Sequence, residues 1–287
     1  MKKKKNFTSI LLVIILIAGL SLLLYPSFAN YWNNYRASKV IASYVEDISN
    51  MKQTEIDEMW NEAKEYNEKL AQRGFVYDLN KQQSQEYESV LNIGGSGVMG
   101  YIEIDSLGVS LPIYHGTSDG VLQVAVGHLD WTSLPVGGES SHCVLSGHRG
   151  LPSAKLFTDL DQLREGDTFT LNVLDKVLTY EVDQIRVVKP AEVSELKIED
   201  GKDYCTLVTC TPYGINTHRM LVRGHRIETK DTVHVVSEAT VIEPMIIAPI
   251  LALPVLLVLL GVLVFKPKKN RKKRVSNGGN LHEKKNK

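Results

Sequence analysis

Two long stretches without charged residues stand near the ends of the chain. The first covers residues 7–28 and follows the four lysines Lys2 to Lys5, and the second covers residues 245–265. As a helix, the second stretch would span about 30 Å, the thickness of the hydrocarbon core of a bilayer. The pattern therefore predicts transmembrane segments on both sides of the main part of the chain.

The first stretch fits either a signal peptide or a membrane anchor. Ser27-Phe28-Ala29 has the small-x-small pattern of a cleavage site, while the apolar run of residues 10–24 is long for a signal peptide. We expect an uncleaved anchor. Lysine and arginine flank the outer ends of both stretches, so the positive-inside rule predicts cytoplasmic termini and places residues 30–240 outside the cell.

Helical periodicity follows the first apolar stretch. Residues 31–72 contain two apolar stripes with spacings of three and four, which predict two amphipathic helices. The stripes consist of Val40, Ile41, Tyr44, Val45 and Ile48 in the first helix and of Ile56, Met59, Trp60, Ala63, Tyr66 and Leu70 in the second. We expect both stripes to pack on the main domain and not on a second molecule, so the protein is predicted to be monomeric.

From Tyr101 onward the pattern changes to short β-type runs separated by Gly, Pro, Asp and Ser. The predicted strands cover residues 100–105, 109–114, 141–147, 168–174, 177–188, 204–210 and 219–227, and short helices are predicted near residues 118–125 and 153–163. Many short strands at this spacing are typical of a β-barrel or a β-sandwich. The predicted fold class is therefore mainly β, with N-terminal helices.

The formal net charge is zero, but the charges are unevenly distributed. Residues 2–5 and 266–287 are strongly basic, whereas residues 6–265 carry 19 Lys and Arg against 32 Asp and Glu, a formal balance of −13. An acidic body argues against a nucleic-acid partner, and the basic ends fit a membrane partner. Three cysteines without a Cys-x-x-Cys spacing exclude a disulfide scaffold and predict no metal site.

The strongest candidate for chemistry is a cysteine at the end of a predicted strand. Residues 204–210 are rich in β-branched residues, and Pro212 and Gly214 stop the run just after Cys210. Arg219 opens the next run, so it lies beside Cys210 if the two runs pair as a hairpin. A guanidinium there favours the reactive thiolate and can donate hydrogen bonds to an oxyanion that forms when the sulfur attacks a carbonyl.

Proton transfer needs a third residue, and imidazole is the usual choice near neutral pH. Of the eight histidines, His148 is best placed, because it follows the apolar run of residues 143–147 and is flanked by Gly147 and Gly150, where the backbone is expected to turn sharply. A lone histidine of this kind is more often an ordinary loop residue. The cysteine and the arginine have independent support, which favours a role for His148 as acid or base.

Several ordered motifs surround these three residues. Thr206-Leu207-Val208-Thr209-Cys210 is followed nine residues later by Arg219, and His148 lies in the segment Leu-Ser-Gly-His-Arg-Gly. Further matches cover residues 100–104, 111–117, 127–129 and 133–138. Together these motifs resemble the sortases, and more narrowly the class C, or pilin-polymerising, sortases of Gram-positive bacteria. The resemblance covers roughly residues 98–228.

The resemblance implies an eight-stranded β-barrel in which His148, Cys210 and Arg219 meet at one edge. It also implies a cysteine transpeptidase without a cofactor. Cys210 would cleave the Thr-Gly bond of a Leu-Pro-X-Thr-Gly-type sorting signal, form a thioester and pass the acyl group to a lysine of another pilin subunit. His148 would move the protons, and Arg219 would hold the oxyanion and the substrate backbone. The implied partners are pilin subunits with a C-terminal sorting signal.

The chain is accordingly divided into five parts. They are a basic cytoplasmic end with a signal or anchor segment at residues 1–29, a helical region with a possible lid at 30–98, the catalytic β-barrel at 99–240, a transmembrane helix at 241–265 and a basic cytoplasmic tail at 266–287. This division predicts an enzyme of the cell membrane whose catalytic domain is extracellular.

Three other interpretations compete with this one. A housekeeping sortase, which attaches proteins to the cell wall, shares the chemistry, but the C-terminal apolar segment and the long helical stretch before the barrel favour class C. A papain-like protease is disfavoured because its cysteine precedes its histidine in sequence. In a non-catalytic, membrane-tethered β-domain, Cys210 would be a buried core thiol, which is the usual case for an arbitrary strand cysteine.

Class C sortases resemble one another in a lid before the barrel, which an Asp-Pro-aromatic anchor holds over the cysteine. The matching region, residues 74–97, lacks this anchor, because Asp78 is followed by Leu79 and is preceded by Phe75 and Tyr77. We expect a weak lid in which Asp78 pairs with Arg219 and Tyr77 or Phe75 covers Cys210. Equally, the segment could be a mobile linker, as the glycines of residues 94–97 indicate.

The other two cysteines occupy equivalent positions. Cys143 lies five residues before His148, and Cys205 lies five residues before Cys210, so each points to the strand face opposite its catalytic neighbour. The resemblance brings the two strands side by side. The cysteines are therefore expected either to face each other, as thiols or as a disulfide, or to be two separate core residues.

Overall fold

The structure is a computed structural model that describes residues 2–74 and 77–229. Residues 22–229 belong to one compact unit, and residues 2–21 belong to a separate one. Eight strands are present in the first of these units: β1 (Val98–Ile104), β2 (Val109–His115), β3 (Val126–His128), β4 (Ser141–Ser146), β5 (Thr168–Val173), β6 (Lys176–Val188), β7 (Asp203–Thr211) and β8 (His218–Ile227).

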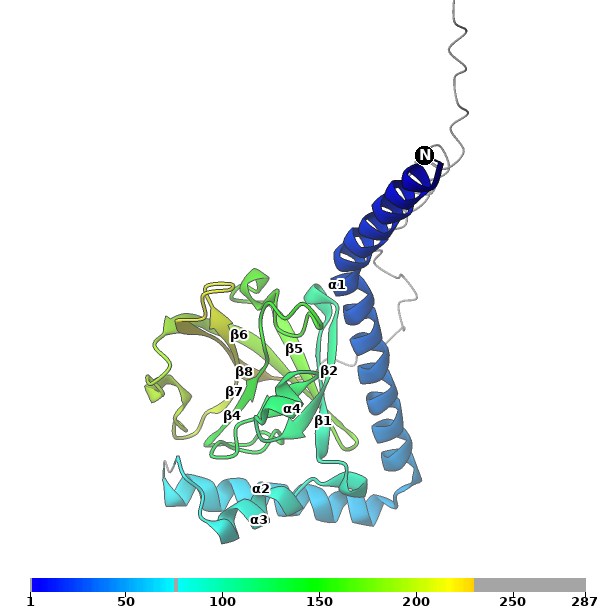
Figure 1. Ribbon diagram of the computed structural model, residues 1–287. Coiled ribbons are helices and arrows are strands. Elements are labelled where there is room, and N and C mark those ends of the chain that lie inside the picture. Colours follow the sequence, from blue (N-terminus) through cyan, green and yellow to red (C-terminus); the bar gives the residue numbers. More distant parts are fainter. Residues whose placement is uncertain (1, 75–76, 230–287) are drawn as a thin grey trace, which may run out of the picture. The chain divides into compact units, whose positions relative to one another are not determined.

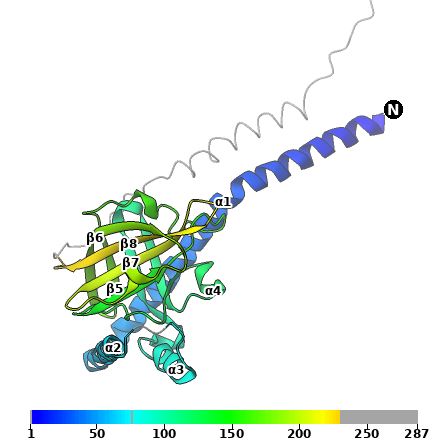
Figure 2. The ribbon, with the colours of Figure 1, turned by 90° about the vertical axis from the view of Figure 1, so that its left-hand side faces the viewer.

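The strands close into a barrel in the order β1-β2-β3-β4-β7-β8-β6-β5 (Figures 1 and 2). Two of the pairings, β2 with β3 and β4 with β7, are parallel, and the others are antiparallel. Because the strands of a parallel pair run in the same direction, β4 and β7 end at the same edge of the barrel. The predicted eight-stranded barrel is confirmed.

Two local predictions differ from the structure. Strand β3 was not predicted, because three residues are too few to display an alternating pattern. The helix expected near residues 153–163 consists of turns with a single 3-10 turn at Leu160–Gln162. Leu156 is buried and has a φ of 42°, which a right-handed α-helix does not accommodate, so the chain cannot continue as a helix through this residue.

The barrel core is filled from the alternate positions of the strands. In β6, for example, Leu178, Tyr180 and Val182 are buried and the residues between them are partly exposed. The ring of Tyr180 stacks on the ring of Phe169 from β5, with centroids 5.6 Å apart. This alternation separates an inner face, which holds the core, from an outer face that is available to form a site.

A long helix, α1 (Lys2–Asn50), precedes the barrel. By length and composition, its apolar N-terminal stretch is long enough to cross a membrane, as the sequence predicts. The C-terminal half of α1 packs on the barrel, where the Tyr44 hydroxyl donates to the Met99 carbonyl (3.0 Å) and accepts from the Leu174 amide (2.8 Å). The predicted C-terminal transmembrane segment and the basic tail lie outside the described residues.

Two further helices, α2 (Gln53–Arg73) and α3 (Lys81–Ser89), lie together at one end of the barrel (Figures 1 and 2). The side chain of Asn67 on α2 is buried and holds both backbone groups of Leu134, accepting from the amide at 2.7 Å and donating to the carbonyl at 3.1 Å. Helix α3, which the sequence did not predict, begins with a capping box between Asn80 and Gln83.

We predict that Asn67→Ala lowers the free energy of unfolding by about 1–3 kcal/mol, because it leaves the buried amide of Leu134 without a partner, whereas the Leu134 carbonyl still accepts from the Val136 amide at 2.8 Å. Urea denaturation monitored by circular dichroism measures the effect. Asn61→Ala, on the exposed face of the same helix, is the control, since it makes the same change in helix propensity without losing these bonds. Equal stability of the two variants would contradict the prediction.

Candidate active site

The hairpin of β7 and β8 places Cys210 beside Arg219. The two residues are directly opposite each other in the antiparallel register, so their side chains lie on the same face of the sheet. That face is the outer one, because Cys205 and Leu207 of β7 and Met220 and Val222 of β8 all belong to the barrel core. Cys210 and Arg219 are both partly exposed.

The guanidinium of Arg219 is held at one end only. Its Nη1 donates to the carbonyls of Asn216 (3.3 Å) and His218 (3.1 Å) in and next to the β7–β8 loop. Within the described residues, its Nε and Nη2 donate no hydrogen bond. Because a guanidinium carries five N–H donors in a fixed plane, the group is oriented and still has donors to offer to a substrate.

His148 reaches Cys210 through the parallel pairing of β4 with β7. The register pairs Ser146 with Val208, and two bonds continue it past the end of β4: the Gly147 amide donates to the Val208 carbonyl (3.1 Å) and Thr209 Oγ1 donates to the Gly147 carbonyl (2.7 Å). Continued by one more residue, this register puts His148 at the position beside Cys210. The structure therefore brings together the three residues that the sequence singled out.

The loop that carries His148 is shaped by its two glycines for different reasons. A Cβ on Gly147 would lie 2.6 Å from the buried ring of Phe157, so only glycine fits there, although its φ is ordinary. Gly150 has a φ of 77°, which is the sharp turn that the sequence predicted. The His148 carbonyl accepts from the Phe157 amide at 3.1 Å, and these contacts fix where the loop leaves the barrel.

Arg149 was missed by the sequence analysis, although it lies next to His148 in the matched motif. Its guanidinium forms an ion pair with Asp161, donates to Thr211 Oγ1 at 3.3 Å and lies over the ring of Tyr213. The side chain is only 9% exposed. Arg149 therefore ties the histidine loop to the end of β7 and acts as a positioning residue.

Cys143 and Cys205 are unsuited to catalysis. They are paired in the register of β4 and β7, both are buried in the barrel core, and both are free thiols. Burial raises the pKa of Cys205 well above its ordinary value. Of the two alternatives from the sequence, the facing pair is the one observed, and it leaves Cys210 as the accessible thiol.

A groove with a volume of about 270 Å³ leads away from Arg219 along the outer face of the barrel. Val208 and Leu221 of the hairpin line one part of it, and the last residue of β6, Val188, lines another together with Pro190, Glu192, Val193 and Leu196 of the β6–β7 connection. The lining is largely apolar: Leu122, Leu129, Trp131, Val188, Val193, Leu196, Val208 and Leu221. The groove can therefore accept an extended peptide with apolar side chains.

The expected lid lies partly outside the described residues, which exclude Phe75. Tyr77 is about half exposed, and its ring packs on the ring of Trp131 at the groove, with centroids 5.2 Å apart. Asp78 is exposed, and in the described part of the chain it forms no ion pair with Arg219. Tyr77 is thus at the rim of the groove, while the expected pairing of Asp78 is not formed.

Comparisons with known proteins give one family. The sortase domain profile matches residues 102–227. The structure of sortase C1 from Streptococcus agalactiae has 49% sequence identity to this chain and a TM-score of 0.66. The alignment covers 67% of this chain and 100% of the sortase C1 chain. The structure of Clostridium perfringens sortase C with the C-terminal cell wall sorting motif also has 49% identity, with a TM-score of 0.60. That alignment covers 67% of this chain and 100% of the sortase C chain. Sortase A of Streptococcus agalactiae is 28% identical over 72% of this chain and 79% of its own.

We predict that iodoacetamide labels Cys210 alone in the native protein and all three cysteines after denaturation without a reductant. The reason is that Cys143 and Cys205 are buried free thiols, whereas Cys210 is partly exposed. Peptide mapping by mass spectrometry measures both states. Slow labelling of native Cys210 would support a non-catalytic β-domain, and two missing thiols after denaturation would reveal a disulfide.

Proposed function

The chain belongs to the sortase family, and from this premise we propose that it is a cysteine transpeptidase in which Cys210, His148 and Arg219 act on proteins with a C-terminal sorting signal. One observation carries the assignment of the residues. The β7–β8 register pairs Cys210 with Arg219, and His148 follows two residues after Ser146, the last β4 residue paired with β7, so a continued register would put its imidazole beside the thiol. All three are partly exposed, and Arg219 lines the apolar groove.

In the first half-reaction, the Cys210 thiolate attacks the carbonyl carbon of the threonine in a Leu-Pro-X-Thr-Gly-type signal. The free donors of Arg219 stabilise the negative oxygen that develops on this carbon. His148 then donates a proton to the leaving glycine amine, and a thioester between Cys210 and the threonine remains. The apolar walls of the groove suit the leucine and proline of such a signal.

In the second half-reaction, an amine replaces the glycine. His148 accepts a proton from the incoming amine, which attacks the thioester carbon and releases the Cys210 sulfur. We propose that this amine is a lysine of another pilin subunit, so that the product is a covalent pilus. The support for class C is the similarity to two sortase C structures at 49% identity, compared with 28% and 38% for two proteins named Sortase A.

The site has to favour an amine over water, which is far more abundant. A positioned nucleophile gains a large effective molarity over the same group free in solution. The second half-reaction therefore depends on holding the acceptor lysine beside the thioester, and not on a strong base. A housekeeping sortase, which attaches proteins to the cell wall, is the alternative with the same first half-reaction, and the identity of the acceptor distinguishes the two.

The location of the enzyme follows from its substrates. The apolar part of α1 is proposed to anchor the chain in the membrane, with the barrel on the extracellular side, where pilins are assembled. The division into residues 1–29, 30–98, 99–240, 241–265 and 266–287 stays a proposal, as does a monomeric enzyme. In this arrangement both termini are cytoplasmic.

We predict that Cys210→Ala abolishes the thioester adduct with a sorting-signal peptide, because the covalent route is lost, while the fold is retained. Arg219→Lys should lower kcat/KM about 10²–10³-fold, because an ammonium cannot present the planar donors of a guanidinium. Intact-mass spectrometry and peptide cleavage measure the two effects.

Arg223→Lys is the matched control for Arg219→Lys. Arg223 lies on the same face of β8 and pairs with Asp183 at 2.9 Å, away from Cys210. Its substitution should leave the rate within a few-fold of the wild type. An adduct on Cys143 or Cys205, or equal losses in the two arginine variants, would contradict the assignment.

We further propose that Tyr77 is the remnant of a lid that restricts access to the groove through its contact with Trp131. If the lid closes the groove, the substrate binds only the open fraction of the molecules. Tyr77→Ala should therefore raise both the alkylation of Cys210 and peptide cleavage, by several-fold at most. Asp78→Ala is the neighbouring control, and unchanged rates in Tyr77→Ala would show that this residue does not gate the site.

A further inference from the structure

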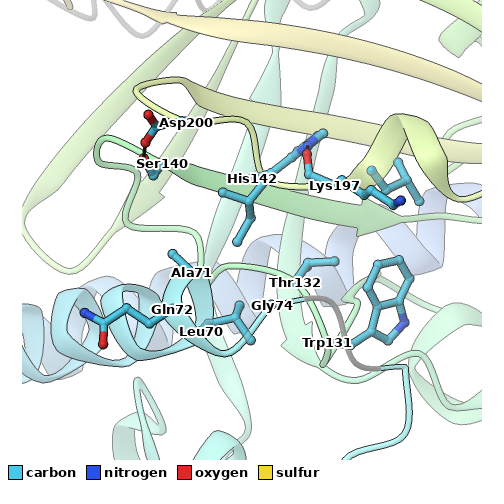
Figure 3. Close-up of a pocket in the computed structure, with 12 residues that line it drawn as sticks. Leu70, Ala71, Gln72, Gly74, Trp131, Thr132, Ser140, His142, Lys197 and Asp200 are labelled. Carbon is cyan, nitrogen blue, oxygen red and sulfur yellow. Dashed lines mark hydrogen bonds between the residues drawn. The ribbon is translucent and has the colours of Figure 1, made fainter.

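A second cavity, with a volume of about 450 Å³, lies on the outer face of the barrel (Figure 3). The C-terminal end of α2 forms one wall with Leu70 and Ala71, and the β6–β7 connection forms the opposite wall with Leu196 and Ile198. Trp131 lies at one end of the cavity, while Ser140 and Asp200 lie at the other. None of these residues takes part in the chemistry proposed above.

The second cavity adjoins the groove that reaches Arg219, the partner of Cys210 in the hairpin. Trp131 and Leu196 line both of them, so these two side chains form a common wall. His142 lies between the walls, but its ring nitrogens are already paired with the Lys197 carbonyl (2.8 Å) and Thr206 Oγ1 (2.7 Å). Burial lowers the pKa of His142 to about 4, so the ring is neutral and serves as part of the wall.

The length of the path indicates what can reach the cavity. His142, which lines the cavity, is paired with Tyr204, six residues before Cys210 on β7. At roughly 3.3 Å per residue the path to Cys210 is about 20 Å. The four residues of a Leu-Pro-X-Thr segment, bound to Cys210 through the threonine, cover about 13 Å of it. The next two or three residues of the same chain therefore extend to the cavity.

We propose that the second cavity binds an apolar side chain of the sorted protein, two or three residues on the N-terminal side of the Leu-Pro-X-Thr motif. This inference rests on the proposed function and adds a subsite to it. The acceptor protein is excluded as the occupant, because its amine has to meet the thioester at Cys210 and the groove between is filled by the acyl chain. Leu70, Ala71, Trp131, Leu196 and Ile198 make the cavity apolar enough to favour such a side chain.

Two peptides test the proposal on the full chain in detergent micelles. Both carry the same sorting motif. In the first peptide several Ser-Gly residues precede the motif, and in the second peptide Phe occupies the second and third positions before the motif. The Phe peptide should react with a kcat/KM about 3–10-fold higher, mainly through a lower KM, as expected from burying one apolar side chain. Ala71→Trp fills the cavity and should abolish this difference, while leaving the rate of the Ser-Gly peptide unchanged.

Glu68→Trp, on the exposed face of α2, is the matched control and should retain the full difference. Ile198→Ser makes the opposite wall polar and should reduce the difference without filling the cavity. Equal rates for the two peptides in the wild type, or an undiminished difference in Ala71→Trp and Ile198→Ser, would overturn the proposal and leave the proposed function intact. Failure of both peptides to form a thioester on Cys210 would overturn both.

Discussion

The register between β4 and β7 is the constraint on which the site depends. In this parallel pair, Cys143 is opposite Cys205 and Leu145 is opposite Leu207, and all four side chains are buried in the barrel core. A slip of β7 by one residue would turn these apolar groups outward and Cys210 inward. The cost of exposing the core therefore fixes the position of the thiol on the outer face, next to the histidine loop.

Two kinds of contact extend this order beyond the ends of the strands. Gly147 lets the backbone pass against Phe157, and Arg149 links the histidine loop to Asp161 and to Thr211 at the end of β7. Neither contact touches the reacting atoms. Both restrict the conformations of the loop before a substrate binds, and this restriction keeps His148 correctly positioned relative to Cys210.

The sequence predicted those features that depend on local patterns. The alternation in residues 204–210 and 219–227 predicted the two faces of the hairpin. The equal offsets of Cys143 and Cys205, together with the family resemblance, left a facing pair as one of two alternatives, and the structure shows the facing pair. Strand β3 was missed because three residues show no alternating pattern, and helix α3 was missed although its capping box of Asn80 and Gln83 is a local signal. The turns of residues 153–163 were missed because the sequence pattern does not reveal the positive φ of Leu156. The groove was also missed, since one wall is the β6–β7 connection, which has no periodicity to reveal what it covers.

The helices before the barrel are part of the same packed unit. Tyr44 of α1 and Asn67 of α2 hydrogen-bond to backbone groups of the barrel, and both side chains are buried. The compositional boundary near residue 98 is therefore not a boundary of packing. Because α2 also supplies Leu70 and Ala71 to the second cavity, the barrel alone would lack that wall. The residues proposed for the chemistry belong to the barrel. Recognition of the substrate residues before the sorting motif would depend on α2 as well, so substitutions in α2 can alter this recognition without altering the catalytic residues.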